Sequence, residues 1–169
     1  MIEPNEVKAR AKKLEGQNYS FRKFLKMRAD RDELDAQFLE LHNELFEGFD
    51  CCKCSNCCKY YRIFLSSDEV VRIAGFLGLS QSRFAEEYLA DAGDEGQYEL
   101  SGKPCLFLGN DGRCRIEDCK PEVCVDFPYT DQPDRLSSMF SIIEHAEICP
   151  VVFEILERLK EMYGFKNRT

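Results

Sequence analysis

Five of the ten cysteines of this 169-residue chain lie within eight consecutive residues, Cys51-Cys52-Lys53-Cys54-Ser55-Asn56-Cys57-Cys58. Disulfide bonds inside so short a run would be strained, because a bridge requires Cα atoms about 4.4–6.8 Å apart with opposed Cβ vectors. Thiols repeated every third residue, as in Cys51, Cys54 and Cys57, allow one tight loop to surround a single soft metal ion or cluster. The run therefore predicts a metal site.

The composition also favours metal ligation over disulfide bonding. A chain of this length with 44% hydrophobic residues can bury a core without covalent staples. Residues 1–8 lack the basic segment and apolar run of a signal peptide, and no apolar run approaches the roughly 18 residues of a membrane span. We therefore expect a cytoplasmic protein without a membrane partner, in which reduced thiols serve as metal ligands.

The charge of the chain argues against nucleic-acid binding. With 23 basic and 31 acidic residues the net charge is −8, whereas a nucleic-acid platform requires a basic stripe. Residues 8–28 are locally basic but alternate with acidic residues, which is typical of a solvated helix face. We expect no nucleic-acid partner, and the sequence does not indicate a protein partner.

The first 48 residues contain no cysteine and read as helix. Residues 5–28 predict one or two helices broken near Gly16, and residues 32–47 carry one apolar stripe that Gly48 ends: Leu34, Phe38, Leu41 and Leu45. We expect residues 1–48 to be a helical extension packed on the core, with a dimer contact as the alternative. Residues 49–169 would form the cysteine-cluster metal-binding domain.

The remaining elements predict a small α+β fold, mainly helical, with a short antiparallel β-hairpin and cysteine-ligated metal. Residues 60–65 are typical of a strand, and Ser66 and Glu69 are spaced as a capping box for the helix that follows. A second helix begins after Ser80, and residues 91–104 predict a loop with a short strand. Residues 105–116 predict the hairpin and residues 117–128 a loop. Cys149 as N-cap and Pro150 at the first helical position begin the last helix.

The thiols divide into two possible ligand sets. A C-x₂-C-x₂-C run with a separate Cys-Pro is the bacterial ferredoxin pattern, which Cys51, Cys54, Cys57 and Cys149 match in part. A second set of four thiols remains: Cys58, Cys105, Cys114 and Cys124. A zinc ribbon normally has two separate C-x₂-C pairs, but zinc as a structural staple remains open. We expect an iron–sulfur cluster, with zinc as the alternative.

Four further residues are weaker candidates. Cys52 lies between the repeated positions and is expected to point away from the metal, and Cys119 is either a spare ligand or a small buried hydrophobe. His145 lies near Cys149 as a possible substitute ligand. His42 lies beside the apolar stripe and is expected to be partly buried and neutral.

The ordered cysteines resemble the bacterial YkgJ-type cysteine-cluster family, a zinc- or iron-chelating domain with the hallmark C-x-x-C-x-x-C-C. The resemblance spans residues 49–150 and continues through three further segments: Cys105 with Phe107-Leu108, residues 111–116 around Cys114, and Pro121, Cys124 and Phe127-Pro128. Four positions depart from the family pattern: Ser55 for Gly, Glu117 for Tyr, Lys120 for Arg and Val125 for Arg. The resemblance implies metal ligation, and the lost arginines weaken any implied anion or substrate contact.

The same resemblance leaves an enzyme open, since related domains occur in flagellin lysine methylases. The radical S-adenosylmethionine signature C-x-x-x-C-x-x-C is missing, because Tyr61 stands where Cys54 and Cys58 would need their third cysteine. Nucleotide-binding glycine motifs and a nucleophile–base pair are also missing. We therefore expect a metal-binding protein with a structural, metal-carrying or redox role. A cluster-dependent protein-modifying enzyme is the alternative.

Overall fold

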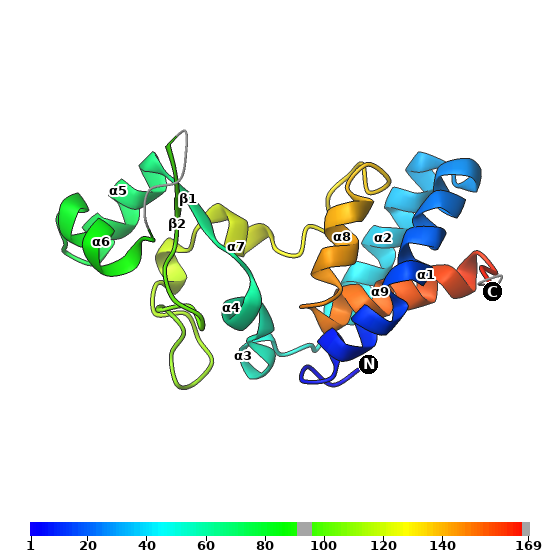
Figure 1. Ribbon diagram of the computed structural model, residues 1–169, viewed down its shortest axis with the longest axis horizontal. Coiled ribbons are helices and arrows are strands. Elements are labelled where there is room, and N and C mark those ends of the chain that lie inside the picture. Colours follow the sequence, from blue (N-terminus) through cyan, green and yellow to red (C-terminus); the bar gives the residue numbers. More distant parts are fainter. Residues whose placement is uncertain (91–95, 167–169) are drawn as a thin grey trace. The chain divides into compact units, whose positions relative to one another are not determined.

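The computed structural model describes residues 1–90 and 96–166, which form two compact units (Figure 1). The first unit combines Met1–Phe49 with Pro128–Thr169, and the second contains Asp50–Phe127. The expected division into residues 1–48 and 49–169 stays a prediction, since compactness alone does not say which parts fold independently. No helix of the described residues is long and apolar enough to cross a membrane.

The first unit is a helical bundle built from both ends of the chain. Its helices are α1 (Val7–Arg28), α2 (Arg31–Phe46), α8 (Met139–His145) and α9 (Pro150–Met162). Helix α9 packs against α1 and α2, and α8 packs against α1. All four residues of the expected α2 stripe are buried, and Gly48 has φ +76° just after the helix, which confirms the expected helix and its end.

Helix α1 differs from the prediction because it continues through Gly16. A mid-helix glycine costs only about 1 kcal/mol relative to alanine. Val7 and Ala11 are buried before Gly16, and Phe21 and Leu25 are buried after it. Packing on both sides of the glycine therefore outweighs its low helix propensity, and one unbroken helix forms.

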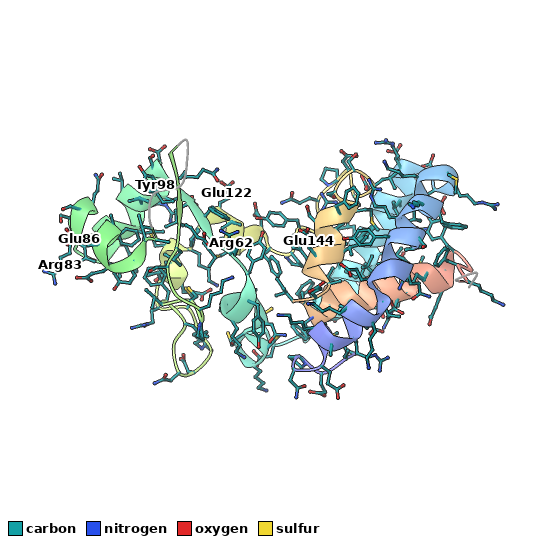
Figure 2. All side chains as sticks on the ribbon, in the orientation of Figure 1. Arg62, Arg83, Glu86, Tyr98, Glu122 and Glu144 are labelled. Atoms are coloured by element: carbon teal, nitrogen blue, oxygen red, sulfur yellow. The ribbon has the colours of Figure 1, made fainter. Side chains whose placement is uncertain are left out.

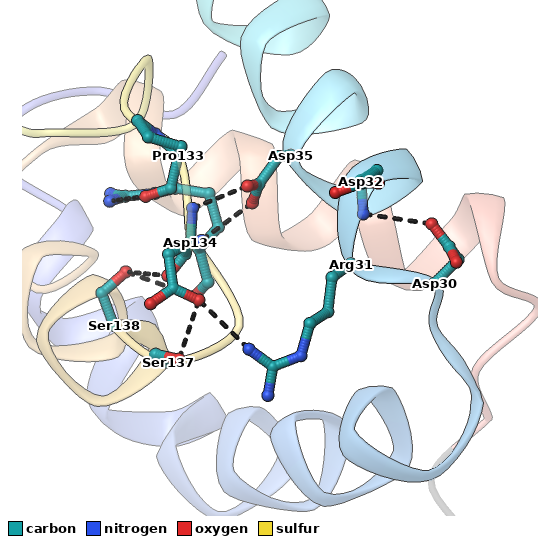
Figure 3. A network of polar contacts seen from close by, with 9 residues as sticks. Asp30, Arg31, Asp32, Asp35, Pro133, Asp134, Ser137 and Ser138 are labelled. Carbon is teal, nitrogen blue, oxygen red and sulfur yellow. Dashed lines mark hydrogen bonds and ion pairs between the residues drawn. The ribbon is translucent and has the colours of Figure 1, made fainter.

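A network of polar contacts joins α2 to the segment that leads into α8 (Figure 3). The Asp35 carboxylate accepts hydrogen bonds from the backbone N–H groups of Asp134 at 2.6 Å and Arg135 at 2.8 Å. Arg31 adds an ion pair to Asp134 at 3.3 Å. These contacts hold residues 134–135 against α2. No helix was expected after them, but α8 begins at Met139.

The second unit has a small sheet with helices around it. Its elements are α3 (Cys51–Cys54), α4 (Asn56–Tyr60), β1 (Phe64–Ser66), α5 (Ser67–Phe76), α6 (Gln81–Tyr88), β2 (Gln97–Glu99), the 3₁₀ helix η2 (Glu117–Cys119) and α7 (Glu122–Asp126). Strands β1 and β2 are antiparallel, with Leu65 opposite Tyr98. The core includes Leu65, Ile73, Phe84 and Ile116. The expected class, mainly helical with a short antiparallel sheet, is confirmed.

The place of the antiparallel pair differs from the expected hairpin. In residues 105–116 the backbone forms turns with one isolated bridge between Leu108 and Cys114, while the sheet joins residues 64–66 to residues 97–99. The expected strand at residues 60–65 therefore begins later, because Tyr60 ends α4. Part of the expected 91–104 loop, residues 91–95, lies outside the described residues. The expected loop at 117–128 contains η2 and α7.

The caps that the sequence predicted are present. Ser66 and Glu69 form a capping box at the start of α5, and the Ser80 hydroxyl accepts a hydrogen bond from the N–H of Arg83 at the start of α6. Cys149 is the N-cap of α9, and Pro150 is its first residue. Local signals of this kind depend on few residues, which is why they could be recognised before the fold was known.

Two leucines of α2 provide a test of the first unit's core. Leu34 is fully buried, whereas Leu39 on the same helix is 44% exposed. Leu34→Ala should lower the free energy of unfolding by about 2–5 kcal/mol, because it removes buried methyl groups and leaves a cavity. Leu39→Ala, the control, should change it by less than about 0.5 kcal/mol. Urea denaturation of the full chain measures both, and equal effects would contradict the packing described.

Candidate metal centre

The cysteine run folds as two short helices rather than as one loop. Asp50 caps α3 by accepting hydrogen bonds from the N–H groups of Cys52 and Lys53. Ser55, with φ +51°, separates α3 from α4 and donates a hydrogen bond from its hydroxyl to the Cys52 carbonyl at 2.7 Å. A serine in this conformation is uncommon, and its position matches the glycine that the family resemblance led us to expect.

A turn near Cys114 packs against the first of these helices. Gly112 has φ +81°, and a Cβ atom placed on it would lie 1.9 Å from the Cys52 carbonyl oxygen. The Ser55 hydroxyl also lies 3.4 Å from the Gly112 carbonyl oxygen. Glycine is therefore needed at residue 112 for both backbone conformation and close approach. This contact brings the segment of Cys114 to the cysteine run.

Backbone hydrogen bonds bring three of the predicted ligands together. The N–H of Cys105 donates to the Cys58 carbonyl at 2.8 Å, so these residues lie on neighbouring segments. The bridge between Leu108 and Cys114 then returns the chain toward Cys105. These two contacts explain how residues that are up to 56 positions apart in the sequence lie on neighbouring segments.

The thiols of these residues and of Cys124 are electrostatic neighbours. Burial raises the pKa of Cys105, Cys114 and Cys124, the last to about 12, and the pKa of each is raised further by the charges of others in the set. The pKa of Cys58 is raised first by a hydrogen bond with the Cys57 thiol and then by burial. We call Cys58, Cys105, Cys114 and Cys124 the Cys58 group.

Lys120 supplies positive charge beside the Cys58 group. Its ammonium group lowers the pKa of Cys58, Cys114 and Cys124 and donates a hydrogen bond to Glu117 at 2.5 Å. Burial acts to lower the pKa of Lys120, but the carboxylate of Glu117 and the nearby thiols raise it overall. A cation in this position stabilises thiolates, which are the form of cysteine that binds metal.

The other cysteines of the run lie around Cys58. Cys54 is buried, and its pKa is raised by burial and also by the charge of Cys58. Cys51 is exposed as a whole residue, but its thiol is partly buried. This burial raises the pKa of Cys51, and the charge of Cys54 raises it further. The Cys57 thiol hydrogen-bonds with Cys58. The second unit thus holds both the Cys58 group and three members of the other predicted set.

Cys149, the fourth member of that other set, belongs to the first unit. It is buried at the start of α9, where its N–H donates to the His145 carbonyl at 2.8 Å. His145 is also buried, and burial lowers its pKa. Both residues remain sequence predictions as ligands. His42 is half-buried with a lowered pKa, caused mainly by burial, and its Nδ1 lies 2.8 Å from the Thr130 hydroxyl.

Within residues 1–90 and 96–166, no three His, Cys, Asp or Glu side chains are arranged as a group that could hold a metal ion. Repulsion between charged thiols acts over several ångströms, whereas ligation requires sulfur atoms to converge at about 2.3 Å from one zinc ion. The Cys58 group is gathered, therefore, but its side chains do not converge on one point.

Two residues that contact this part of the chain were not identified from the sequence as site residues. Glu69 was recognised only as part of a helix cap, and Arg72 was not singled out. Arg72 Nη1 donates a hydrogen bond to Cys119 Sγ at 3.2 Å, and Cys119 is 5% exposed. Cys119 is thus a buried thiol with a charged partner.

The donor set fits a soft metal. Ten cysteines without a disulfide among them, all within the described residues, provide thiolate sulfur, which selects zinc, copper(I) or iron–sulfur clusters over hard cations. The sequence model of the CxxCxxCC family, described as a putative zinc- or iron-chelating domain, matches residues 50–150. This match covers more than half of the chain, which therefore belongs to that family. Comparisons with curated proteins and with solved structures found no match.

Two glycines of the second unit test the contact between the Gly112 turn and the cysteine run. Both have positive φ, +81° at Gly112 and +68° at Gly78, but nothing lies within 4 Å of a Cβ placed on Gly78. Either alanine substitution costs roughly 1–2 kcal/mol, because a residue with a Cβ atom is strained at positive φ. Gly112→Ala must in addition displace the Cys52 carbonyl. Gly112→Ala should therefore lower the thermal midpoint more than Gly78→Ala and reduce the metal content, which Gly78→Ala should leave unchanged. Equal midpoints and equal metal contents would contradict this contact.

Proposed function

We propose that the second unit binds zinc or an iron–sulfur cluster through the Cys58 group: Cys58, Cys105, Cys114 and Cys124. The observation that supports this most is that four thiols from separate segments are neighbours, so that the charge of Cys58 raises the pKa of Cys105, Cys114 and Cys124. A structural core would have no need of four neighbouring ionisable thiols. Membership of a zinc- or iron-chelating family supports the same conclusion.

Cys51, Cys54 and Cys57 are proposed as ligands of the same or a second centre, with Cys149 as their fourth member. The three residues recur at every third position, and their short helices place Cys54 and Cys57 beside Cys58. Cys149 is included on its sequence signal alone, the Cys-Pro pair. The free N–H groups at the start of α9 would stabilise a thiolate there.

The protein's own residues would favour metal binding in two ways. Lys120 offsets thiolate charge near Cys58 and Cys114, and partial burial of the thiols excludes water from the sulfur atoms. Because the pKa of each thiol in the Cys58 group is raised, metal binding should displace protons from it. A bound iron–sulfur cluster would supply electron transfer, whereas zinc would supply structural stability.

We propose iron–sulfur as the native group, with zinc as the alternative, and a structural, metal-carrying or redox role. Four thiols in the Cys58 group are enough to close a four-coordinate centre, which is typical of structural and electron-transfer sites. A cluster-dependent protein-modifying enzyme would instead require an open coordination position. The cytoplasm, where thiols stay reduced, is the proposed location.

Metal analysis of anaerobically purified protein tests the function. Wild-type protein should contain iron with sulfide, or zinc, and a brown colour that reductant bleaches would identify the cluster. Cys58→Ser should lose the metal of the Cys58 group, because Cys58 acts electrostatically on each of the other three thiols. Cys52→Ser is the control, since Cys52 lies outside both ligand sets, and should keep it. Wild-type protein with neither iron nor zinc, and with all ten thiols free, would contradict the proposal.

A separate variant tests the ligand in the first unit. If Cys149 is the fourth ligand of the Cys51, Cys54 and Cys57 set, Cys149→Ala should reduce the metal-to-protein ratio by the content of one centre. The Cys58 group would keep its metal, so Cys149→Ala protein should retain the content of that centre. A Cys149→Ala protein with the wild-type ratio would remove Cys149 from the proposed ligands.

A further inference from the structure

Glu69 on α5 contacts the chain segment that lies between Cys114 and Cys124. Its Oε1 accepts a hydrogen bond at 2.9 Å from the backbone N–H of Glu122. Glu122, which is labelled in Figure 2, is the first residue of α7. Glu69 Oε2 accepts hydrogen bonds from the N–H and hydroxyl of Ser66 at 2.8 and 3.0 Å. One carboxylate, 17% exposed, therefore joins the start of α5 to the start of α7.

Arg72, one turn further along α5, contacts Cys119 and Lys120, which precede Glu122 in the same segment. Its Nη1 donates to Cys119 Sγ at 3.2 Å, and its Nη2 donates to the Lys120 carbonyl at 3.0 Å. The Cys119 thiol lies 3.8 Å from the Arg72 carbonyl, to which it donates in return. Arg72 Nη2 also lies 4.0 Å from Glu69 Oε1. We call Glu69 and Arg72 the α5 pair.

The segment held by the α5 pair, residues 119–122, determines where two groups of the centre lie. It carries Lys120, and the N–H of Cys124 donates to the Pro121 carbonyl at 2.9 Å, so the backbone of Cys124 follows the position of Pro121. A shift of this segment would move the cation and the fourth thiol together. The other three thiols belong to segments joined by their own backbone contacts.

We propose that the α5 pair positions the cysteine centre: Glu69 and Arg72 hold residues 119–122 so that Lys120 and Cys124 face Cys58, Cys105 and Cys114. The effect on metal rests on the proposed function, whereas the effect on the segment does not. Loss of a hydrogen bond that orients a metal ligand directly typically weakens binding by roughly 10–100-fold, and the α5 pair, which holds the backbone beside Cys124, should act within that range.

Arg83 on α6 provides a matched control for Arg72. Its Nε donates to Glu87 at 2.7 Å, a contact within a single helix, and its side chain is 67% exposed. Arg83→Met and Arg72→Met thus remove the same group, but only the second releases the 119–122 segment. Ser66→Ala is likewise the control for Glu69→Ala, because it removes the cap of α5 and leaves the contact between Glu69 and Glu122.

Thiol alkylation of metal-free protein tests the inference without metal. Iodoacetamide modification is followed by mass spectrometry, residue by residue, with half-exposed Cys52 as the internal standard. Cys119 should be modified slowly in wild-type protein and in Arg83→Met, and roughly tenfold faster in Arg72→Met, because the segment then opens locally. Equal Cys119 rates in the two methionine variants would overturn the inference.

Metal release from zinc-loaded protein to a chelator tests the consequence for the centre. Arg72→Met and Glu69→Ala should release zinc roughly tenfold faster than Arg83→Met and Ser66→Ala, and Arg72→Lys, which keeps one donor, should be intermediate. Release at the control rates from a wild-type protein that binds zinc would overturn the inference and leave the proposed function intact. If wild-type protein binds no metal, the proposed function fails, and Cys119 alkylation alone decides the role of the α5 pair.

Discussion

Neighbouring thiols that are partly removed from water resist ionisation, and the second unit holds four of them close together. Each member of the Cys58 group has a raised pKa because of burial, a hydrogen-bonded neighbour or the charge of other thiols. Positive charge is needed to ionise them. Lys120 supplies part of it, and a bound metal would supply the rest. The contacts that hold Lys120 and Cys124 in place are therefore part of the chemistry of the site.

The positions of the four thiols depend on backbone contacts between segments that are remote in sequence. Cys105 reaches Cys58 through a direct hydrogen bond, the Gly112 turn packs on the Cys52 carbonyl, and α5 holds residues 119–122. None of these contacts involves a thiol group. The additional hydrogen bond from Arg72 to Cys119 does. The scaffold can thus gather the ligands, and their side chains would need only to converge on the metal.

The fold could be predicted where one short stretch carried its own signal. The α2 stripe, the capping box of Ser66 and the start of α9 each required only a few residues, and all were confirmed. The prediction failed where packing overrode a local preference, as at Gly16 in α1, and where a turn was mistaken for paired strands, as at residues 105–116. Helix α8 was missed because its burial depends on α1 and α9.

By itself, the sequence determined the chemistry of the site: ten cysteines, their spacing and an acidic chain favour thiolate metal binding over nucleic-acid binding. Only the tertiary structure decided which cysteines are neighbours and which charged groups lie beside them. It showed that Arg72 binds the thiol of Cys119, and it placed Lys120 beside Cys58. The physical reason is that ligand chemistry belongs to residue type and spacing, whereas electrostatic neighbourhood depends on distances that only the folded backbone defines.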